Sequence, residues 1–267
     1  MELQKLLNIM SRLRSEDGCP WDRAQNHESL ISYLIEETYE LTEALDSKQP
    51  EHIKEELGDL LFQIVFHTQL AQEAGWFNMT EVIEKIAQKM VKRHPHVFAN
   101  AKYETAEEVS KQWQERKKEE GKHQNSILEG IPKALPALLR AYRVQKRASR
   151  VGFDWTDANG AITKLEEEIN ELKDAIGEID KANTVNSNTV NNSNNIEEEL
   201  GDILFSTVNV SRLLAINPEE ALRKATNKFI RRFNYIEEQI MSTGQDLGTV
   251  TLKEMDRLWD EAKIFFK

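Results

Sequence analysis

The chain has 267 residues, of which 39% are hydrophobic and 30% are charged, with 11 glycines, 6 prolines and one cysteine. This length and composition favour one large or two medium helical domains with buried cores, and they argue against a disordered chain. The formal net charge of −11 argues against nucleic-acid binding, which needs clustered Lys and Arg, but a small anionic substrate remains possible if a metal supplies positive charge.

The sequence also bears on the compartment in which the chain works. It contains no apolar run of about 18 residues, so we expect no membrane span. The N-terminus MELQKLLNIMSRLRSEDG is amphipathic and lacks the basic start, unbroken apolar stretch and cleavage site of a signal peptide. Cys19 is the only cysteine, which excludes an internal disulfide and fits a reducing environment. We therefore expect a cytoplasmic protein.

The spacing of apolar residues predicts the helices of the first half. Amphipathic patterns indicate helices over residues 2–14, 29–46, 51–74, 80–93 and 104–120. Thr80 is a suitable N-cap for the fourth of these, and Pro95 would stop it just after Arg93. The fifth is highly charged and contains Trp113.

The second half repeats this order of elements. Residues 121–136 include two prolines and few long apolar runs, so we place the boundary there and predict domains over residues 1–121 and 134–267. The stretch LLRAYRVQKRASRVGFDW then echoes LLNIMSRLRSEDGCPWD from the N-terminus. Helices are predicted over residues 197–214, 218–242 and 252–267, the last of which contains Trp259.

Both halves are organised around two acidic helices. LIEETYEL is followed by EELGDLLF in the first half, and LEEEINEL by EELGDILF in the second. Residues three apart share one face of a helix, so each motif presents a pair of carboxylates. Two such helices packed antiparallel would gather four carboxylates. The two predicted quartets are Glu37, Glu40, Glu56 and Asp59, and Glu168, Glu171, Glu199 and Asp202.

The spacer between the carboxylate pairs differs between the halves. It takes 15 residues in the first half and 27 in the second, where residues 183–195 read NTVNSNTVNNSNN. A tract rich in Asn, Ser and Thr buries little apolar surface. We therefore predict a mobile loop insertion that joins the two acidic helices without interrupting either.

Comparison of the halves limits the chemistry they can share. All six histidines and the only cysteine precede residue 124, which excludes a shared His base, a thiol nucleophile or a zinc site of His/Cys type. Carboxylate oxygens suit Mg²⁺, with Mn²⁺ as a possible substitute, and Mg²⁺ keeps positions open for phosphate oxygens. A metal-bound water would be the nucleophile. A Lys and an Arg four residues apart also recur, as Lys89 with Arg93 and Lys228 with Arg232, and could hold phosphates.

At these residues the chain resembles the MazG family of nucleoside triphosphate pyrophosphohydrolases, within the all-α NTP pyrophosphatase superfamily. The resemblance covers nearly the whole chain as two tandem domains, and CPWDRAQNHESL is typical of the first domain of two-domain members. It implies an all-α fold of two tandem antiparallel helical bundles, completed by homodimerisation. It also implies Mg²⁺-dependent hydrolysis of nucleoside triphosphates, ATP included, between the α- and β-phosphates, in nucleotide pool control or house-cleaning.

The resemblance also assigns residues. Both carboxylate quartets would be metal ligands. Catalytic roles would fall to Glu167, Glu168, Lys228 and Arg232. Nucleotide contacts would come from Lys164, Leu165, Glu166, Glu167, Glu168, Lys228, Arg232 and Trp259 in the second half, and from Lys89, Arg93 and Trp113 in the first.

Other interpretations stay open. The acidic pairs and the Lys/Arg pairs could be solvated helix faces, and both tryptophans could be core residues; recurrence of the acidic pattern in register favours a site. A di-iron helical bundle would need a Glu-x-x-His motif on two helices, and the second half has no histidine. A regulatory module that binds nucleotide or metal without turnover would carry the same carboxylates. Pyrophosphate release with a panel of nucleotides separates this binder from an enzyme.

Overall fold

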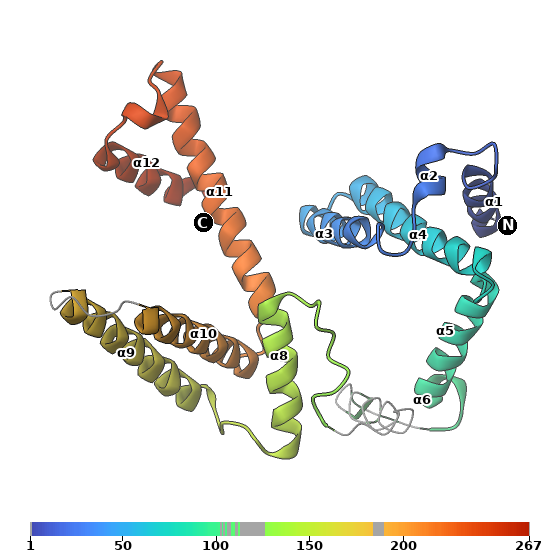
Figure 1. The fold of residues 1–267 in the computed structure, drawn as a ribbon, viewed down its shortest axis with the longest axis horizontal. Coiled ribbons are helices and arrows are strands. Elements are labelled where there is room, and N and C mark those ends of the chain that lie inside the picture. The colour runs from blue at the N-terminus through green and yellow to red at the C-terminus, as the bar shows by residue number, and fades with distance from the viewer. Residues whose placement is uncertain are drawn as a thin grey trace. The chain divides into compact units, whose positions relative to one another are not determined.

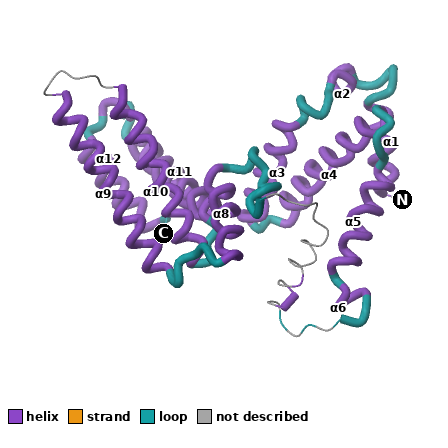
Figure 2. Tube along the Cα trace, turned by 60° about the horizontal axis from the view of Figure 1, so that its bottom comes forward, coloured by secondary structure: helices purple, strands orange, loops and turns teal. Residues whose placement is uncertain are grey.

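The structure, a computed structural model, describes residues 2–101, 103, 105, 108, 109, 112, 126–183 and 190–266. Across these residues every regular element is a helix, as the sequence predicts (Figure 2). The chain divides into two compact units, Met1–Lys122 and His123–Lys267, and each is described by itself. In the described part of the chain, none of the helices combines the length and the apolar character that a membrane span needs.

The first unit is a long helical hairpin with shorter helices at its ends. Its elements are α1 (Glu2–Leu13), α2 (Pro20–Ala24), α3 (Ile31–Ser47), α4 (Pro50–Glu73), α5 (Met79–Arg93) and α6 (Pro95–Phe98) (Figure 1). The N-cap of α5 is Asn78 and not Thr80, because the Asn78 side chain accepts from the Glu81 amide while Glu81 accepts from the Asn78 amide. Most of the helix predicted over residues 104–120, with Trp113, lies outside the described residues.

The core of the first unit lies where α1 and the start of α5 pack against the second half of α4. Its buried residues are Met10, Leu30, Val65, Phe66, Leu70 and Met79. Arg14 adds a bidentate contact to Glu73 at the end of α4, with Nε to Oε1 at 2.9 Å and Nη2 to Oε2 at 2.6 Å. This packing fixes one end of the hairpin and leaves the first half of α4, with Glu56 and Asp59, beside α3.

The second unit repeats the hairpin. Its elements are α8 (Ala137–Ala148), the 3-10 turn η1 (Ser149–Val151), α9 (Ala158–Asn183), α10 (Val190–Leu213), α11 (Pro218–Ser242), the 3-10 turn η2 (Leu247–Thr249) and α12 (Leu252–Phe265) (Figure 1). α9 and α10 form the hairpin that corresponds to α3 and α4. α8 packs against α10, and the Gln145 side chain donates to the Phe205 carbonyl at 2.8 Å. Asn217 caps α11 by accepting from the Glu219 and Glu220 amides.

Part of the Asn-rich tract is helical where the sequence predicts a loop, and residues 184–189 of the tract lie outside the described residues. α9 continues to Asn183 and α10 already begins at Val190, so residues 190–195 are helical. A helix that has already formed gains one hydrogen bond for each residue it adds, whereas a new helix must first be nucleated. Asn costs well below about 1 kcal/mol per residue relative to Ala in a helix. Extension of α10 toward its N-terminus therefore outweighs the poor helix propensity of residues 190–195.

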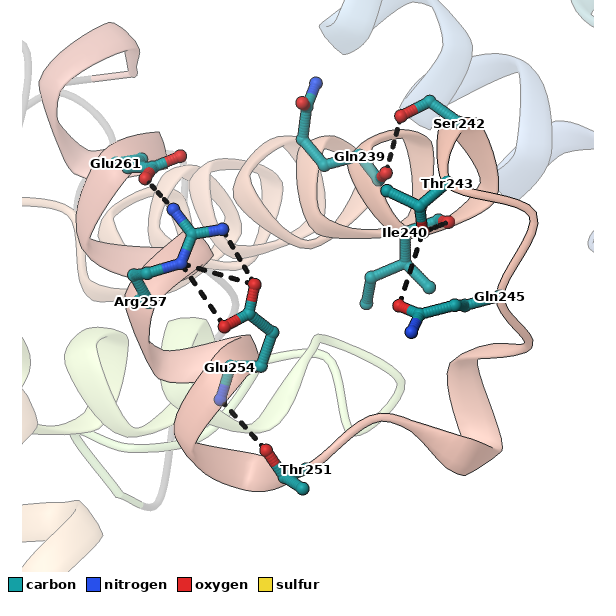
Figure 3. Close-up of polar contacts among 9 residues, drawn as sticks. All are labelled: Gln239, Ile240, Ser242, Thr243, Gln245, Thr251, Glu254, Arg257 and Glu261. Atoms are coloured by element: carbon teal, nitrogen blue, oxygen red, sulfur yellow. Dashed lines mark hydrogen bonds and ion pairs between the residues drawn. The ribbon is translucent and has the colours of Figure 1, made fainter.

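The end of the second unit is a pair of helices, with α12 folded back along α11. They enclose Ile236, Ile240 and Leu258, against which Trp259 packs. The Thr251 hydroxyl caps α12 by accepting from the Glu254 amide, and Arg257 bridges Glu254 and Glu261 (Figure 3). The helix pair thus has its own small core and positions Arg232 and Trp259.

Candidate metal centres

The first hairpin brings three carboxylates together. Glu37 comes from α3, and Glu56 and Asp59 come from one face of α4; one oxygen of each lies within 4.8 Å of the others. The antiparallel packing of α3 on α4 creates this cluster from residues about twenty apart in the sequence. Glu40, predicted as the fourth member, is exposed and lies outside the set.

The first cluster is short of positive charge. Burial raises the pKa of Glu37, and the negative charges of Asp59 and Glu40 raise it further. Glu56 is only 8% exposed; its Oε1 is 3.2 Å from His52 Nε2, and its buried Oε2 has no hydrogen-bond partner among the described residues. A buried carboxylate oxygen without a partner is costly. A divalent cation between the three carboxylates would supply the missing partner, so this donor set fits a metal.

The second hairpin forms a corresponding cluster with a different composition. Glu168 and Glu171 come from α9 and Glu199 from α10, again with one oxygen each within 4.8 Å of the others. The pKa of Glu171 is raised, first by a hydrogen bond with Glu168 and then by burial. Asp202, the fourth predicted ligand, is exposed and lies outside the set. Each half therefore gathers three of its four predicted ligands.

A lysine ammonium already occupies the edge of the second cluster. Lys164 Nζ lies 2.7 Å from a Glu167 oxygen and 3.0 Å from a Glu168 oxygen. These two carboxylates raise the pKa of Lys164, so the ammonium stays charged. Glu168 is 6% exposed and is the buried member of the set. The Lys164 ammonium supplies positive charge at Glu168, as a bound metal cation would, so this carboxylate cluster also fits a metal.

The predicted phosphate contacts of the second half lie on the α11/α12 pair. Arg232 donates to the Phe266 carbonyl from Nε at 3.0 Å and from Nη2 at 2.7 Å, and its guanidinium lies over the Trp259 ring, 5.6 Å from the centroid. α11 packs mainly against α12, and less against α8 and α10. Lys228 is half-buried on the same helix. The packing of α11 directs Arg232 to Trp259 and Phe266.

Two of the three nucleotide contacts predicted in the first half, Lys89 and Arg93, lie on α5. Lys89 lines a shallow hollow on that helix together with Val82 and Ile86, and none of the three clustered carboxylates lines it. Arg93 is the last residue of α5, before Pro95 begins α6. Trp113 lies outside the described residues.

Three contacts between polar side chains and the clustered carboxylates are not predicted from the sequence. His52 contacts Glu56, Gln63 hydrogen-bonds Glu37, and Lys164, which the family resemblance assigned only to nucleotide, is paired with Glu168. His52 and Lys164 each precede their partner by four residues, which is the spacing of neighbours on a helix surface. That spacing is a signal the sequence does carry. The Gln63 contact joins two helices and has no such local signal.

Shortening the second hairpin tests whether its extra length serves the site. Replacing residues 179–192 by a two-residue Gly-Gln linker would match the turn at Lys48 and Gln49, where Lys48 has a φ of 56° that Gly adopts more readily. We expect metal affinity and turnover within a few-fold of wild type, because Glu171 and Glu199 keep the helix lengths that Glu40 and Glu56 have. Calorimetric metal titration and a pyrophosphate assay measure both. A loss as large as that of a ligand variant would assign the tract a direct role at the site.

Comparison with known proteins places this sequence in a family. Residues 25–98 and 158–236 match the MazG nucleotide pyrophosphohydrolase domain. The chain is 46% identical over 261 residues to the nucleoside triphosphate pyrophosphohydrolase/pyrophosphatase MazG of Thermotoga maritima, covering 97% of this chain and 95% of the relative. It is 42% identical over 269 residues to a nucleoside triphosphate pyrophosphohydrolase of Escherichia coli K12, covering 98% and 97%. A crystal structure of a MazG-related protein from Thermotoga maritima aligns with a TM-score of 0.38 and 33% identity, covering 43% of this chain and 98% of that one.

Proposed function

This chain belongs to the MazG nucleotide pyrophosphohydrolase family, and we propose that it hydrolyses nucleoside triphosphates between the α- and β-phosphates. Water adds across the bond from phosphorus to the bridging oxygen, and the products are a nucleoside monophosphate and pyrophosphate. The observation that carries this proposal is the oxygen-only carboxylate cluster in each hairpin, built from the family's motifs. Such clusters suit Mg²⁺, with Mn²⁺ as a substitute.

The cation supplies charge neutralisation at the phosphates and a more acidic water. Glu168, Glu171 and Glu199 would hold it in the second half, with Asp202 one turn from Glu199. The first turns of α9, from Lys164 to Glu168, would contact the nucleotide. Lys228 and Arg232 would bind phosphate oxygens, and Trp259 would lie against the base or sugar.

A second copy of the chain is the proposed complement of each hairpin. Each hairpin carries exposed apolar residues. On α3 and α4 the exposed fraction is 41% to 53%, for Ile31, Ile35, Leu57, Leu61 and Ile64. On α9 and α10 it is 37% to 49%, for Ile162, Ile169, Ile176, Leu200, Leu204 and Phe205. Apolar faces of this extent mark interaction surfaces. Because Arg232 is held on the α11/α12 pair, we propose that homodimerisation brings a cation-bearing helix to each carboxylate cluster.

Charged substitutions on the second hairpin test the dimer. We expect Leu200→Glu combined with Leu204→Glu to convert a dimer into a monomer and to lower pyrophosphate release by at least about tenfold, because buried unpaired charge strongly opposes association. Light scattering after size exclusion measures the mass. Leu252→Glu, at a position 74% exposed on α12, is the matched control and should leave the dimer intact. A monomeric wild-type chain with full activity would contradict the proposal.

The activity itself is tested with a panel of ribo- and deoxyribonucleoside triphosphates in the presence of Mg²⁺. Chromatography identifies the nucleotide product, and a coupled assay measures pyrophosphate. We expect monophosphate and pyrophosphate in equal amounts. Release of diphosphate and orthophosphate would show that a different bond is cleaved, and saturable binding without products would favour the non-hydrolytic module.

A single cysteine and the described helices, none of which can cross a membrane, support our proposal that this reaction takes place in the cytoplasm.

A further inference from the structure

We propose that Lys164 is a built-in counter-ion of the second carboxylate cluster, which keeps its affinity for a divalent cation low until the phosphates of a nucleotide take over the ammonium. The inference rests on the proposed function and concerns how its second site is filled. Metal and nucleotide would then bind cooperatively at the second site. The first site would take up metal without nucleotide.

The contacts of Lys164 place one ammonium between a buried and an exposed carboxylate. The Glu168 side chain, 3.0 Å away, is buried and is shared with the metal cluster. The Glu167 side chain, 2.7 Å away, is 55% exposed and lies outside the cluster. Lys164 can therefore release Glu168 while Glu167 still holds it. In that position the ammonium lies at the edge of the site, where a phosphate oxygen can accept from it.

Competition for Glu168 follows from electrostatics. Two positive ions about 4 Å apart near a protein surface repel each other. A cation that binds Glu168 must displace the ammonium or be repelled by it. An anionic polyphosphate reverses this relation, because it attracts the cation and the ammonium together. The ammonium thus opposes metal binding in the absence of nucleotide and favours nucleotide binding once metal is present.

The first half offers an internal comparison. The residue before LIEETYEL is Tyr33 and the residue before LEEEINEL is Lys164, so a neutral phenol occupies the corresponding position. The Tyr33 ring makes an edge contact with Trp21, with 5.7 Å between the centroids. The basic group that contacts this cluster is His52, at Glu56 Oε1. A lysine bound to a cluster carboxylate is thus a feature of the second half among the described residues.

The test measures metal binding directly. Glu56→Gln is introduced first to disable the first cluster, so that Mn²⁺ titrations followed by electron paramagnetic resonance report on the second. In this background we expect Lys164→Gln to tighten Mn²⁺ binding on the order of tenfold in the absence of nucleotide. A triphosphate with a methylene group between its α- and β-phosphorus atoms cannot be cleaved there. This analogue should tighten Mn²⁺ binding strongly when Lys164 is present and far less in Lys164→Gln.

Three further variants make the result decisive. Lys173→Gln removes the same charge from the same helix, at a lysine whose Nζ contacts Asn170, and should change Mn²⁺ affinity by less than about twofold. Lys164→Arg should retain the wild-type coupling. If Lys164→Gln leaves Mn²⁺ affinity unchanged or weakens it, the inference is overturned while the proposed function stands. If Glu168→Gln in the same background leaves Mn²⁺ binding intact, the metal site of the proposed function is itself wrong.

Discussion

Glu168→Gln is expected to abolish nearly all pyrophosphate release, whereas Glu37→Gln should lower it by far less. Both substitutions remove one clustered carboxylate and keep the side-chain volume, so the comparison isolates the contribution of each half. The difference is expected from the helices that carry the phosphate contacts. α11 runs from Pro218 to Ser242 without a break, and Arg232 in its middle is fixed by the Phe266 carbonyl and the Trp259 ring.

In the first half the corresponding arginine is less well supported by its helix. Arg93 is the last residue of α5, and α6 begins at Pro95. The last turn of a helix lacks intrahelical partners for its carbonyls and frays more readily than the interior. A misplaced phosphate contact can cost on the order of a hundredfold in rate. We therefore expect the second half to carry most of the hydrolysis.

Initial rates at saturating Mg²⁺ and nucleotide measure the effect, with circular dichroism confirming equal folded fractions. Glu36→Gln, on α3 but outside the metal set, serves as a matched control that should keep near wild-type rates. Should Glu37→Gln prove more damaging than Glu168→Gln, the second half would not be the main site of hydrolysis.

Removal of divalent cations should reduce pyrophosphate release to background. The chain carries a net charge of −11, and each site gathers three carboxylates, so a triphosphate with about four negative charges would be repelled without a metal. The ammonium of Lys164 offsets only part of this charge in the second half. Dialysis against excess chelator, followed by titration with Mg²⁺ or Mn²⁺, should abolish and then restore the rate.

The control for this experiment is the chelator already saturated with Ca²⁺ before it is added, which separates metal removal from direct inhibition by the chelator. Thermal unfolding measured alongside shows whether the chain stays folded without metal. Full activity in excess chelator would refute the metal-dependent mechanism.

The helical hairpins and the acidic faces could be predicted from local sequence. Helix periodicity places Glu56 and Asp59 on one face of their helix, and Glu168 and Glu171 on one face of theirs, independently of the tertiary structure. The turn of the first hairpin also follows from a local signal, since Pro50 begins α4. Repetition of these signals in the second half made the pattern specific enough to suggest one family.

The tertiary structure alone decided which of these carboxylates meet. In the first half Glu37 joins the α4 pair and Glu40 stays exposed, whereas in the second half both α9 residues join Glu199 and Asp202 stays exposed. The outcome depends on how the two helices of each hairpin are rotated against each other, and the packing between helices decides that rotation. Residues 190–195 of the Asn-rich tract are helical because α10 extends through them, and Arg232 lies against Trp259 because α12 folds back on α11. Local sequence determines which face of a helix is acidic, but contacts between helices determine what that face meets.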